Sequence, residues 1–329
     1  MGRVGIIGAG AWGTALAQVV ARHGHTALLL ARSESVIASI RHSRIHPSLG
    51  ADIELSDRVV AGSGPVALKD ADLLVLAVPA QASRSVLMSL DAMAGRRVPV
   101  VVTAKGFERD SQALQSDIVG QVWPNAVPVV LSGPSFARDV ALGLPTAVTL
   151  AATDAEILER VAAFFAGPAF RPYLGDDPVG VQLCGGLKNV YALGSGAIEG
   201  AGLGLSARAA FISRAAAEMG RMVDAFGGRP ASVAFLAGMG DLVLSCSSSQ
   251  SRNFRFGLEL GRGGKTADIQ NRLGFLAEGV ASTPVARAMA AGKGVDAPLI
   301  RAVAQLLSGR TSIQTIVKDL MGRPIRREG

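Results

Sequence analysis

The sequence contains little cysteine, few aromatic residues and no long apolar run. Its two cysteines, Cys184 and Cys246, exclude a disulfide framework and a four-cysteine metal site, and we expect both to be reduced thiols. No segment reaches the roughly 18 uninterrupted apolar residues of a membrane-spanning helix, so we expect no transmembrane segment. Hydrophobic residues nevertheless make up 49% of the 329 residues and charged residues only 18%, a composition that excludes disorder.

The charged residues also lack any clustering along the chain. The 33 basic and 26 acidic side chains give a net charge of +7, but no basic stripe alternates with aromatics. We therefore expect no nucleic-acid partner, whereas an excess of cations weakly favours an anionic small molecule. The apolar start, residues 4–21, contains four glycines and no cleavage signal. It predicts a first strand rather than a signal peptide, and the two reduced thiols are those expected of a cytosolic protein.

The order of apolar segments predicts an α/β fold in which a Rossmann-type doubly wound sheet domain precedes an all-α C-terminal domain. Short runs that predict buried strands lie at 3–8, 26–30, 73–78, 98–103, 129–131 and 147–150. Helical stretches between them lie at 13–23, 83–93 and 111–119. Long Ala/Leu/Met-rich stretches then predict helices at 181–198, 207–226, 230–237, 280–291 and 297–308. We place the dinucleotide-binding domain at 1–178 and a helical substrate-binding domain at 179–329, with a turn at 175–178 between them.

A glycine motif follows the first predicted strand and opens the first predicted helix. Gly8 permits a tight turn, Gly10 lets a pyrophosphate approach the backbone, and Gly13 permits close packing of helix on strand. A glycine-rich turn without a ligand is the alternative. At the end of the second strand stands Arg32 where NAD-binding folds usually have an acid, which favours the 2′-phosphate of NADP. Arg32 stacked on the adenine, with NAD also accepted, remains open.

An alcohol dehydrogenase needs a group that takes the hydroxyl proton, and the usual candidates are missing. All four histidines fall in the first 50 residues, at His23, His25, His42 and His46. Neither tyrosine is followed by a lysine four positions later, and no cysteine cluster can hold zinc. Lys188 lies in an otherwise apolar helix, where burial disfavours the charged ammonium, and Lys105 follows a strand end that faces the ligand crevice. The alternatives are a lysine that reaches the surface at 188 and an ordinary loop lysine at 105.

Three further segments supply polar groups that suit a phosphorylated substrate. Asp241, between glycines and apolar residues, could orient a lysine or bind a substrate hydroxyl, and a helix N-cap is the alternative. Consecutive hydroxyl, guanidinium and amide donors occur at Ser251, Arg252 and Asn253, which could instead form a surface turn. A loop after the strand at 129–131 offers backbone donors at Gly133, Ser135 and Ala137.

Taken together, these segments closely resemble bacterial NAD(P)-dependent glycerol-3-phosphate dehydrogenases along nearly the whole chain. The most specific matches are Leu-Ser-Gly-Pro-Ser-Phe-Ala from Leu131, Leu-Lys-Asn at 187–189 and Gln-Ser-Arg-Asn at 250–253. The resemblance implies interconversion of sn-glycerol 3-phosphate and dihydroxyacetone phosphate, in the cytoplasm and in support of phospholipid synthesis. It implies that Lys188 is the proton acceptor. It further implies substrate contacts at Lys105, Gly133, Ser135, Lys188, Asp241, Ser251, Arg252 and Asn253. Implied contacts to NADP, with NAD as a second candidate, are at Gly8, Gly10, Ala11, Trp12, Gly13, Arg32, Lys105, Ala137, Arg252, Leu276 and Glu278.

The chain departs from the family pattern at three places. Ala11 stands where serine is common, which removes one hydroxyl but keeps the backbone amide. The usual Tyr-Leu-Pro after the second strand is replaced around 45–47, so we expect few contacts from that loop to a ligand. Leu276 and Ala277 replace a valine pair, so Glu278 is the residue of this segment that matches the family pattern.

Two other functions remain open: a related reductase of a β-hydroxy acid and a non-catalytic NADP-binding sensor. The Ala-rich helices predict a homodimer.

Overall fold

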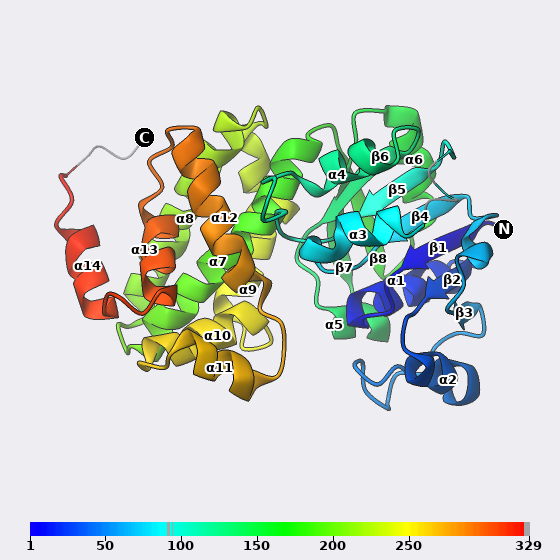
Figure 1. Ribbon diagram of the computed structural model, residues 1–329, viewed down its shortest axis with the longest axis horizontal. Helices are drawn as coiled ribbons and strands as arrows, with labels where there is room; N and C mark the ends of the chain where they lie inside the picture. The colour runs from blue at the N-terminus through cyan, green and yellow to red at the C-terminus, as the bar shows by residue number, and fades with distance from the viewer. Residues whose placement is uncertain (91–92, 94, 326–329) are drawn as a thin grey trace.

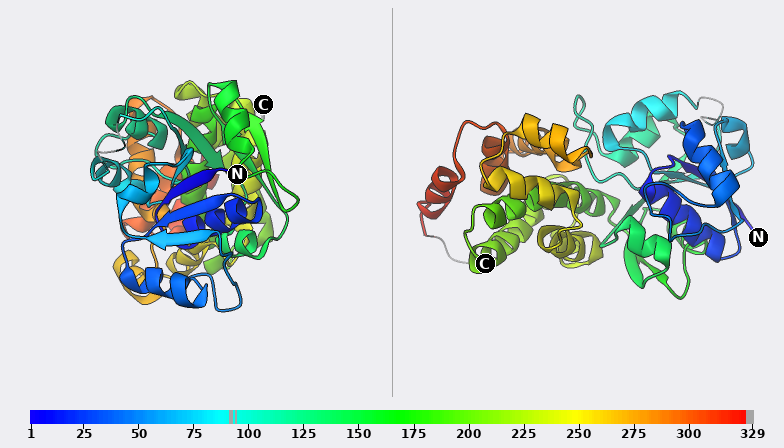
Figure 2. Two further views of the ribbon diagram at one scale, coloured as in Figure 1. Left: turned by 90° about the vertical axis from the view of Figure 1, so that its right-hand side faces the viewer. Right: turned by 90° about the horizontal axis from the view of Figure 1, so that it is seen from below.

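The computed structural model describes residues 1–90, 93 and 95–325, which form a sheet-containing half and a helical half (Figure 1). Figures 1 and 2 place the N-terminus at the sheet end of the long axis and helix α14 at the opposite end. Among the described residues, no helix combines the length and the apolar character needed to cross a bilayer. Cys184 and Cys246 are buried and unpaired.

The described strands form one eight-stranded sheet in the order β3-β2-β1-β4-β5-β6-β7-β8. The strands are β1 (Arg3–Ile7), β2 (Thr26–Leu30), β3 (Val59–Gly62), β4 (Leu73–Leu76), β5 (Pro99–Val102), β6 (Val127–Ser132), β7 (Thr146–Ala151) and β8 (Phe170–Gly175). All neighbours are parallel except β6 and β7, which are antiparallel. The chain order reverses between β1 and β4, so the carboxyl ends of these strands border the crevice where such sheets bind ligands.

Helices cover both faces of this sheet because its central strands are apolar on both sides. Val100 faces one hydrophobic cluster and the next residue, Val101, faces the other. The helices of this half are α1 (Ala11–Arg22), α2 (Glu34–Ser43), α3 (Ser83–Met88), α4 (Gln115–Val122), α5 (Ala137–Leu142) and α6 (Ala155–Ala162), with short 3₁₀ turns at Pro65–Leu68 and Ala80–Ala82. One cluster includes residues of both halves, so the sheet and the helices share a core.

Helix α7 (Pro178–Gly200) runs through the helical half and is buried along most of its length. Asp177 caps its first turn by accepting the N–H of Gly180 at 2.9 Å. The other elements of this half are α8 (Leu205–Ala225), a 3₁₀ turn (Pro230–Ala234), a π-helical turn (Leu236–Gly240), α9 (Asp241–Ser247), α10 (Arg252–Gly261), α11 (Thr266–Leu273), α12 (Glu278–Gly292), α13 (Pro298–Leu307) and α14 (Ile313–Met321). Glycines at 196 and 257 bring the α7 and α10 backbones together, since a Cβ there would collide with a carbonyl of the facing helix.

The predicted fold class is confirmed, and several element predictions need correction. The helix expected at 230–237 is a 3₁₀ turn followed by a π-helical turn. Pro230 begins the first, and the second packs so closely that a Cβ on Gly238 would overlap the backbone of Val233. The helix expected from 83 ends at Met88 before residues 91, 92 and 94, which lie outside the described part, and the one expected from 111 begins at Gln115.

Candidate active site

The glycine motif forms a turn between β1 and α1, and two of its three glycines are required by the geometry of the turn itself. Gly8 has φ +114°, in the region that side chains rarely adopt, and a Cβ on Gly13 would collide with the carbonyl oxygen of Gly8. A Cβ on Gly10 would instead meet open space. Gly10 is the N-cap of α1 and makes no side-chain capping bond. The turn therefore presents a helix N-terminus that a diphosphate can approach, which fits a dinucleotide.

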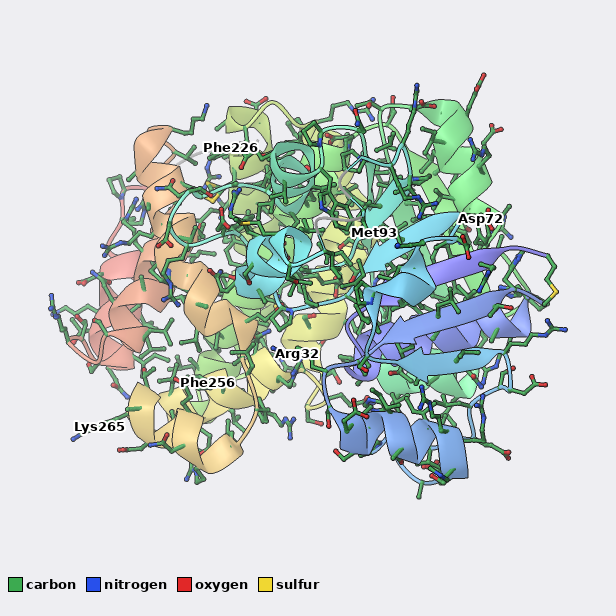
Figure 3. All side chains as sticks on the ribbon, turned by 45° about the vertical axis from the view of Figure 1, so that its right-hand side comes forward. Arg32, Asp72, Met93, Phe226, Phe256 and Lys265 are labelled. Atoms are coloured by element: carbon green, nitrogen blue, oxygen red, sulfur yellow. The ribbon has the colours of Figure 1, made fainter. Side chains whose placement is uncertain are left out.

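The remaining predicted cofactor residues of the sheet half border this turn or follow a neighbouring strand. Ala11 and Trp12 are the first residues of α1, and the half-buried Trp12 packs against the core beneath the sheet. Ala137 begins α5, which packs on α1. Arg32 follows β2 with its side chain exposed, on the side of the sheet domain that faces the helices (Figure 3).

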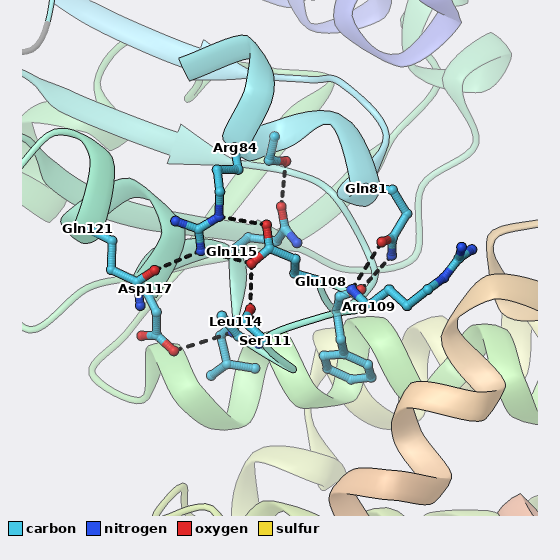
Figure 4. A network of polar contacts seen from close by, with 12 residues as sticks. Gln81, Arg84, Glu108, Arg109, Ser111, Leu114, Gln115, Asp117 and Gln121 are labelled. Carbon is cyan, nitrogen blue, oxygen red and sulfur yellow. Dashed lines mark hydrogen bonds and ion pairs between the residues drawn. The ribbon is translucent and has the colours of Figure 1, made fainter. Parts of the chain in front are cut away.

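Lys105 lies on the loop between β5 and α4, and a polar network fixes this loop (Figure 4). Glu108 accepts two hydrogen bonds from the Arg84 guanidinium, each at 2.8 Å. Gln81 donates to the carbonyl of Phe107 at 2.6 Å and accepts the N–H of Arg109 at 3.0 Å. These contacts hold the three residues after Gly106 and therefore restrict where the Lys105 side chain can reach.

Two lysines from different halves of the molecule meet on one buried carboxylate. Asp241 Oδ2 lies 2.6 Å from Lys105 Nζ, and its Oδ1 lies 3.0 Å from Lys188 Nζ. The Asp241 side chain is 1% exposed and the lysine side chains are 14% and 11% exposed. Lys105 also donates to the carbonyl of Gly133 at 2.9 Å. The structure thus brings together four residues that were predicted from separate segments.

The charges and the burial of this cluster shift the pKa values of Asp241 and Lys105. Burial alone would raise the pKa of Asp241, but the ammonium groups of Lys105 and Lys188 outweigh it and hold that pKa below its usual value. Burial lowers the pKa of Lys105, and the charge of Lys188 adds to this, while Asp241 opposes it. Asp241 is therefore an anion that stabilises two nearby cations, and helix capping is not its role here.

Ser245 is a member of the site that the sequence did not reveal. Lys188 Nζ donates to Ser245 Oγ at 2.7 Å, and this hydroxyl lies 3.2 Å from Asp241 Oδ1. Both residues are on α9, one helical turn apart, so they present their side chains to the same point. The spacing of an acid and a hydroxyl four residues apart was the available signal. Among the described residues, these two partners leave one ammonium hydrogen of Lys188 for a ligand oxygen.

A chain of side-chain amides connects this cluster to α10 and α12. Asn189 donates to the carbonyl of Lys105 at 2.8 Å and accepts from Asn253 Nδ2 at 2.8 Å. Asn253 in turn accepts the N–H of Gly279 at 2.9 Å. The network fixes the N-terminus of α10 and the adjacent Glu278 relative to Lys188.

The predicted anion-binding segment lies at the N-terminus of α10, and its three residues differ in their surroundings. Ser251 is buried and caps the helix by accepting the N–H of Phe254 at 3.2 Å, and within the described part of the chain its hydroxyl donates to no other residue. Asn253 is buried in the amide chain, and Arg252 is exposed. Burial raises the pKa of Glu278, although the positive charge of Arg252 opposes this shift. Arg252 and Glu278 therefore lie close enough to interact.

Two predicted residues remain, of which Ser135 shares a partner with the cluster and Leu276 is exposed before α12. Ser135 Oγ donates to the carbonyl of Gly133 at 3.1 Å, so it shares that carbonyl with Lys105. Leu276 is 47% exposed, beside the buried Ala277 and before the start of α12.

Comparisons with known proteins identify what this arrangement is similar to. The family model of the NAD-dependent glycerol-3-phosphate dehydrogenase N-terminus matches residues 3–158, and that of the C-terminus matches 177–318. A glycerol-3-phosphate dehydrogenase [NAD(P)+] of Brucella ovis is 43% identical over 99% of both chains, and one of Methylobacterium radiotolerans is 44% identical over 99% of this chain and 98% of its own. The crystal structure of glycerol-3-phosphate dehydrogenase from Coxiella burnetii has a TM-score of 0.92 at 33% identity and covers 98% of this chain and 99% of its own.

Proposed function

This chain belongs to the family of NAD-dependent glycerol-3-phosphate dehydrogenases, and we propose that Lys188 moves the proton when it interconverts glycerol 3-phosphate and dihydroxyacetone phosphate. The activity is that of an oxidoreductase that uses NAD(P). The observation that carries the role of Lys188 is the pair of lysines on Asp241, because each ammonium is held in place beside the end of the sheet. The resemblance inferred from the sequence is thus confirmed.

A nicotinamide cofactor held at the glycine turn would supply the hydride chemistry, and residues of the protein handle the proton and the charge. In oxidation, Lys188 as the uncharged amine removes the proton of the C2 hydroxyl; in reduction, its ammonium donates that proton. Lys105 adds positive charge that stabilises the developing alkoxide. Asp241 and Ser245 hold the Lys188 nitrogen so that its remaining hydrogen or lone pair faces the substrate.

The substrate phosphate belongs, in this proposal, at the N-terminus of α10. Arg252 is the exposed guanidinium there and suits bidentate binding of phosphate oxygens. Ser251 and Asn253 each retain one hydrogen for the phosphate beside the bonds that they already make within the protein. Binding energy from the phosphate then positions the reacting carbon.

The proposal also covers the preferred cofactor, the domain boundary, the oligomeric state and the location. The exposed Arg32 supports NADP over NAD as the preferred cofactor. The division into domains at 178 is supported by β8 ending at Gly175 and α7 beginning at Pro178. The homodimer, the cytoplasmic location and the supply of glycerol 3-phosphate for phospholipids remain predictions.

The direct test is a spectrophotometric assay with dihydroxyacetone phosphate and NADPH or NADH, followed at the nicotinamide absorbance. We expect turnover by the unmodified protein and a loss of at least about 10²-fold in kcat for Lys188→Met. Lys265→Met is the matched control, because Lys265 is exposed and lies at the edge of the helical half, away from Arg32 (Figure 3). Near-normal turnover by Lys188→Met would remove Lys188 from the role. NADPH binding without turnover of dihydroxyacetone phosphate would favour the β-hydroxy acid reductase or the sensor.

A further inference from the structure

The loop of residues 44–56, between α2 and β3, contacts the glycine turn, and the sequence did not predict this contact. We propose that His46 on this loop is a positioning residue for the cofactor-binding turn. His46 is 2% exposed, and its Nε2–H donates to the carbonyl oxygen of Ala9 at 2.9 Å. Ala9 lies between Gly8 and Gly10, so the bond reaches the center of the turn. The inference rests on the proposed function, because it assigns a role in binding the nicotinamide cofactor.

A second hydrogen bond fixes the tautomer of this imidazole. The backbone N–H of Ser48 donates to His46 Nδ1 at 3.1 Å, so the ring proton must be on Nε2, where Ala9 accepts it. Burial lowers the pKa of His46, although the bond to the Ala9 carbonyl opposes this, and the neutral ring that both bonds need is favoured. His46 therefore connects its own loop to the turn through one donor and one acceptor.

The bond to Ala9 controls a group that faces the ligand. The Ala9 carbonyl and the Gly10 N–H belong to the same planar trans peptide unit and point in opposite directions. When His46 holds the carbonyl, the Gly10 N–H is directed away from His46 and its loop. Gly10 is exposed, a Cβ there would meet open space, and it is the N-cap of α1. His46 thus preorganises one of the backbone donors that a cofactor diphosphate uses.

The loop has other anchors, so the role of His46 can be tested without unfolding it. Gln18 of α1 donates to the carbonyl of Glu54 at 3.1 Å and accepts the N–H of Ser56 at 2.9 Å. Arg138 of α5 donates to the carbonyl of Leu49 at 2.5 Å. These bonds and the buried Leu49 keep the loop in place when His46 is replaced.

The test compares two replacements that each keep one half of the imidazole. His46→Gln places an amide donor near the position of Nε2 and keeps the bond to Ala9, whereas His46→Asn keeps an acceptor for Ser48 and loses that bond. NADPH binding is measured directly by nicotinamide fluorescence, together with kcat and both KM values. We expect His46→Asn to raise the Kd of NADPH about five- to tenfold, with kcat and the KM of dihydroxyacetone phosphate nearly unchanged. We expect His46→Gln to bind almost as tightly as the unmodified protein.

Controls separate the failure of this inference from the failure of the proposed function. His42→Asn is the matched control, since His42 is exposed on α2. If His46→Asn does not fold, His46→Leu takes its place, because leucine suits a buried position and makes neither of the two bonds of the imidazole. The inference fails and the proposed function stands in either of two cases. One is that NADPH affinity is unchanged in His46→Asn (or His46→Leu), and the other is that His46→Gln weakens NADPH binding equally. The same titrations are run with NADH, and binding of neither NADPH nor NADH by the unmodified protein would overturn the proposed function and the inference with it.

Discussion

Replacing Asp241 by asparagine tests the two-lysine site because the change removes a charge and leaves the shape nearly intact. Both carboxylate oxygens of Asp241 now accept from an ammonium, at 2.6 Å from Lys105 and 3.0 Å from Lys188. An asparagine presents an amide nitrogen in place of one of these oxygens, so one lysine then faces another donor. The two ammonium groups also lose the anion that separates their charges.

The magnitude follows from the burial of the three groups. Removing one partner of a buried ion pair costs about 3–5 kcal/mol, because the remaining charge stays buried without compensation. The lower end applies here, since the lysine side chains are 14% and 11% exposed and keep acceptors at Gly133 and Ser245. We expect a loss of about 3 kcal/mol in the free energy of unfolding for Asp241→Asn. Adding Lys105→Met should restore part of it, because one of the two repelling charges is then gone.

The assay is urea unfolding followed by far-ultraviolet circular dichroism, at neutral pH and along a pH series. The lysines hold the pKa of folded Asp241 below its usual value despite its burial. Its contribution to stability is therefore present above the unfolded pKa of about 3.9 and is lost as the pH falls below it. The difference between the unmodified protein and Asp241→Asn should shrink in that acidic range. Equal stability of the two at neutral pH, or a double variant weaker than Asp241→Asn, would refute the reasoning.

Three further replacements test other parts of the proposal. Arg252→Ala should raise the KM of dihydroxyacetone phosphate about 10- to 100-fold and leave the KM of unphosphorylated dihydroxyacetone unchanged. Equal changes in both KM values would contradict a phosphate contact. Arg32→Ala should lower kcat/KM for NADPH about tenfold or more relative to NADH, and an unchanged ratio in steady-state assays would assign Arg32 no part in cofactor choice. Glu218→Ala should cost about 2–4 kcal/mol of unfolding free energy in urea, because its buried carboxylate accepts the N–H groups of Leu299 at 2.8 Å and Ile300 at 2.9 Å; a loss below about 1 kcal/mol would show that water replaces it.

The parts of the fold that the sequence predicted are those with strong local patterns. The strand before the glycine turn and its neighbours in the sheet are continuous apolar runs because both faces are buried. The three glycines have the spacing that is typical of a turn between a strand and a helix in dinucleotide-binding folds. Two strands were missed. β3 (Val59–Gly62) has only four residues with alternating burial, and β8 (Phe170–Gly175) is an edge strand that contains an exposed arginine and a proline. Short or half-exposed strands carry too few apolar residues to be distinguished from loops.

The candidate site shows a different limit. The resemblance to a family placed Lys105, Lys188 and Asp241 at one site, but no local pattern could show that they meet, since Lys105 and Asp241 are 136 residues apart. Ser245 and His46 were missed for the same reason, because each acts through a partner that only the folded chain brings near. The bond from His46, on the loop at 45–47, to the cofactor-binding turn was not predicted either, and the expectation of few ligand contacts from this loop stays a prediction.

The ion pair between Lys105 and Asp241 also connects the two halves of the molecule. Lys105 comes from the sheet half, and its partner Asp241 from the helical half. The same boundary is crossed by the bond from Asn189 to the Lys105 carbonyl and by the packing of Phe107 against Gly186, where a Cβ would overlap the ring. A rotation of one half against the other would break the ion pair and the apolar contact together. Because the charges that we propose for catalysis also form polar contacts across this interface, we expect replacements at Asp241 to reduce stability and activity in the same variant.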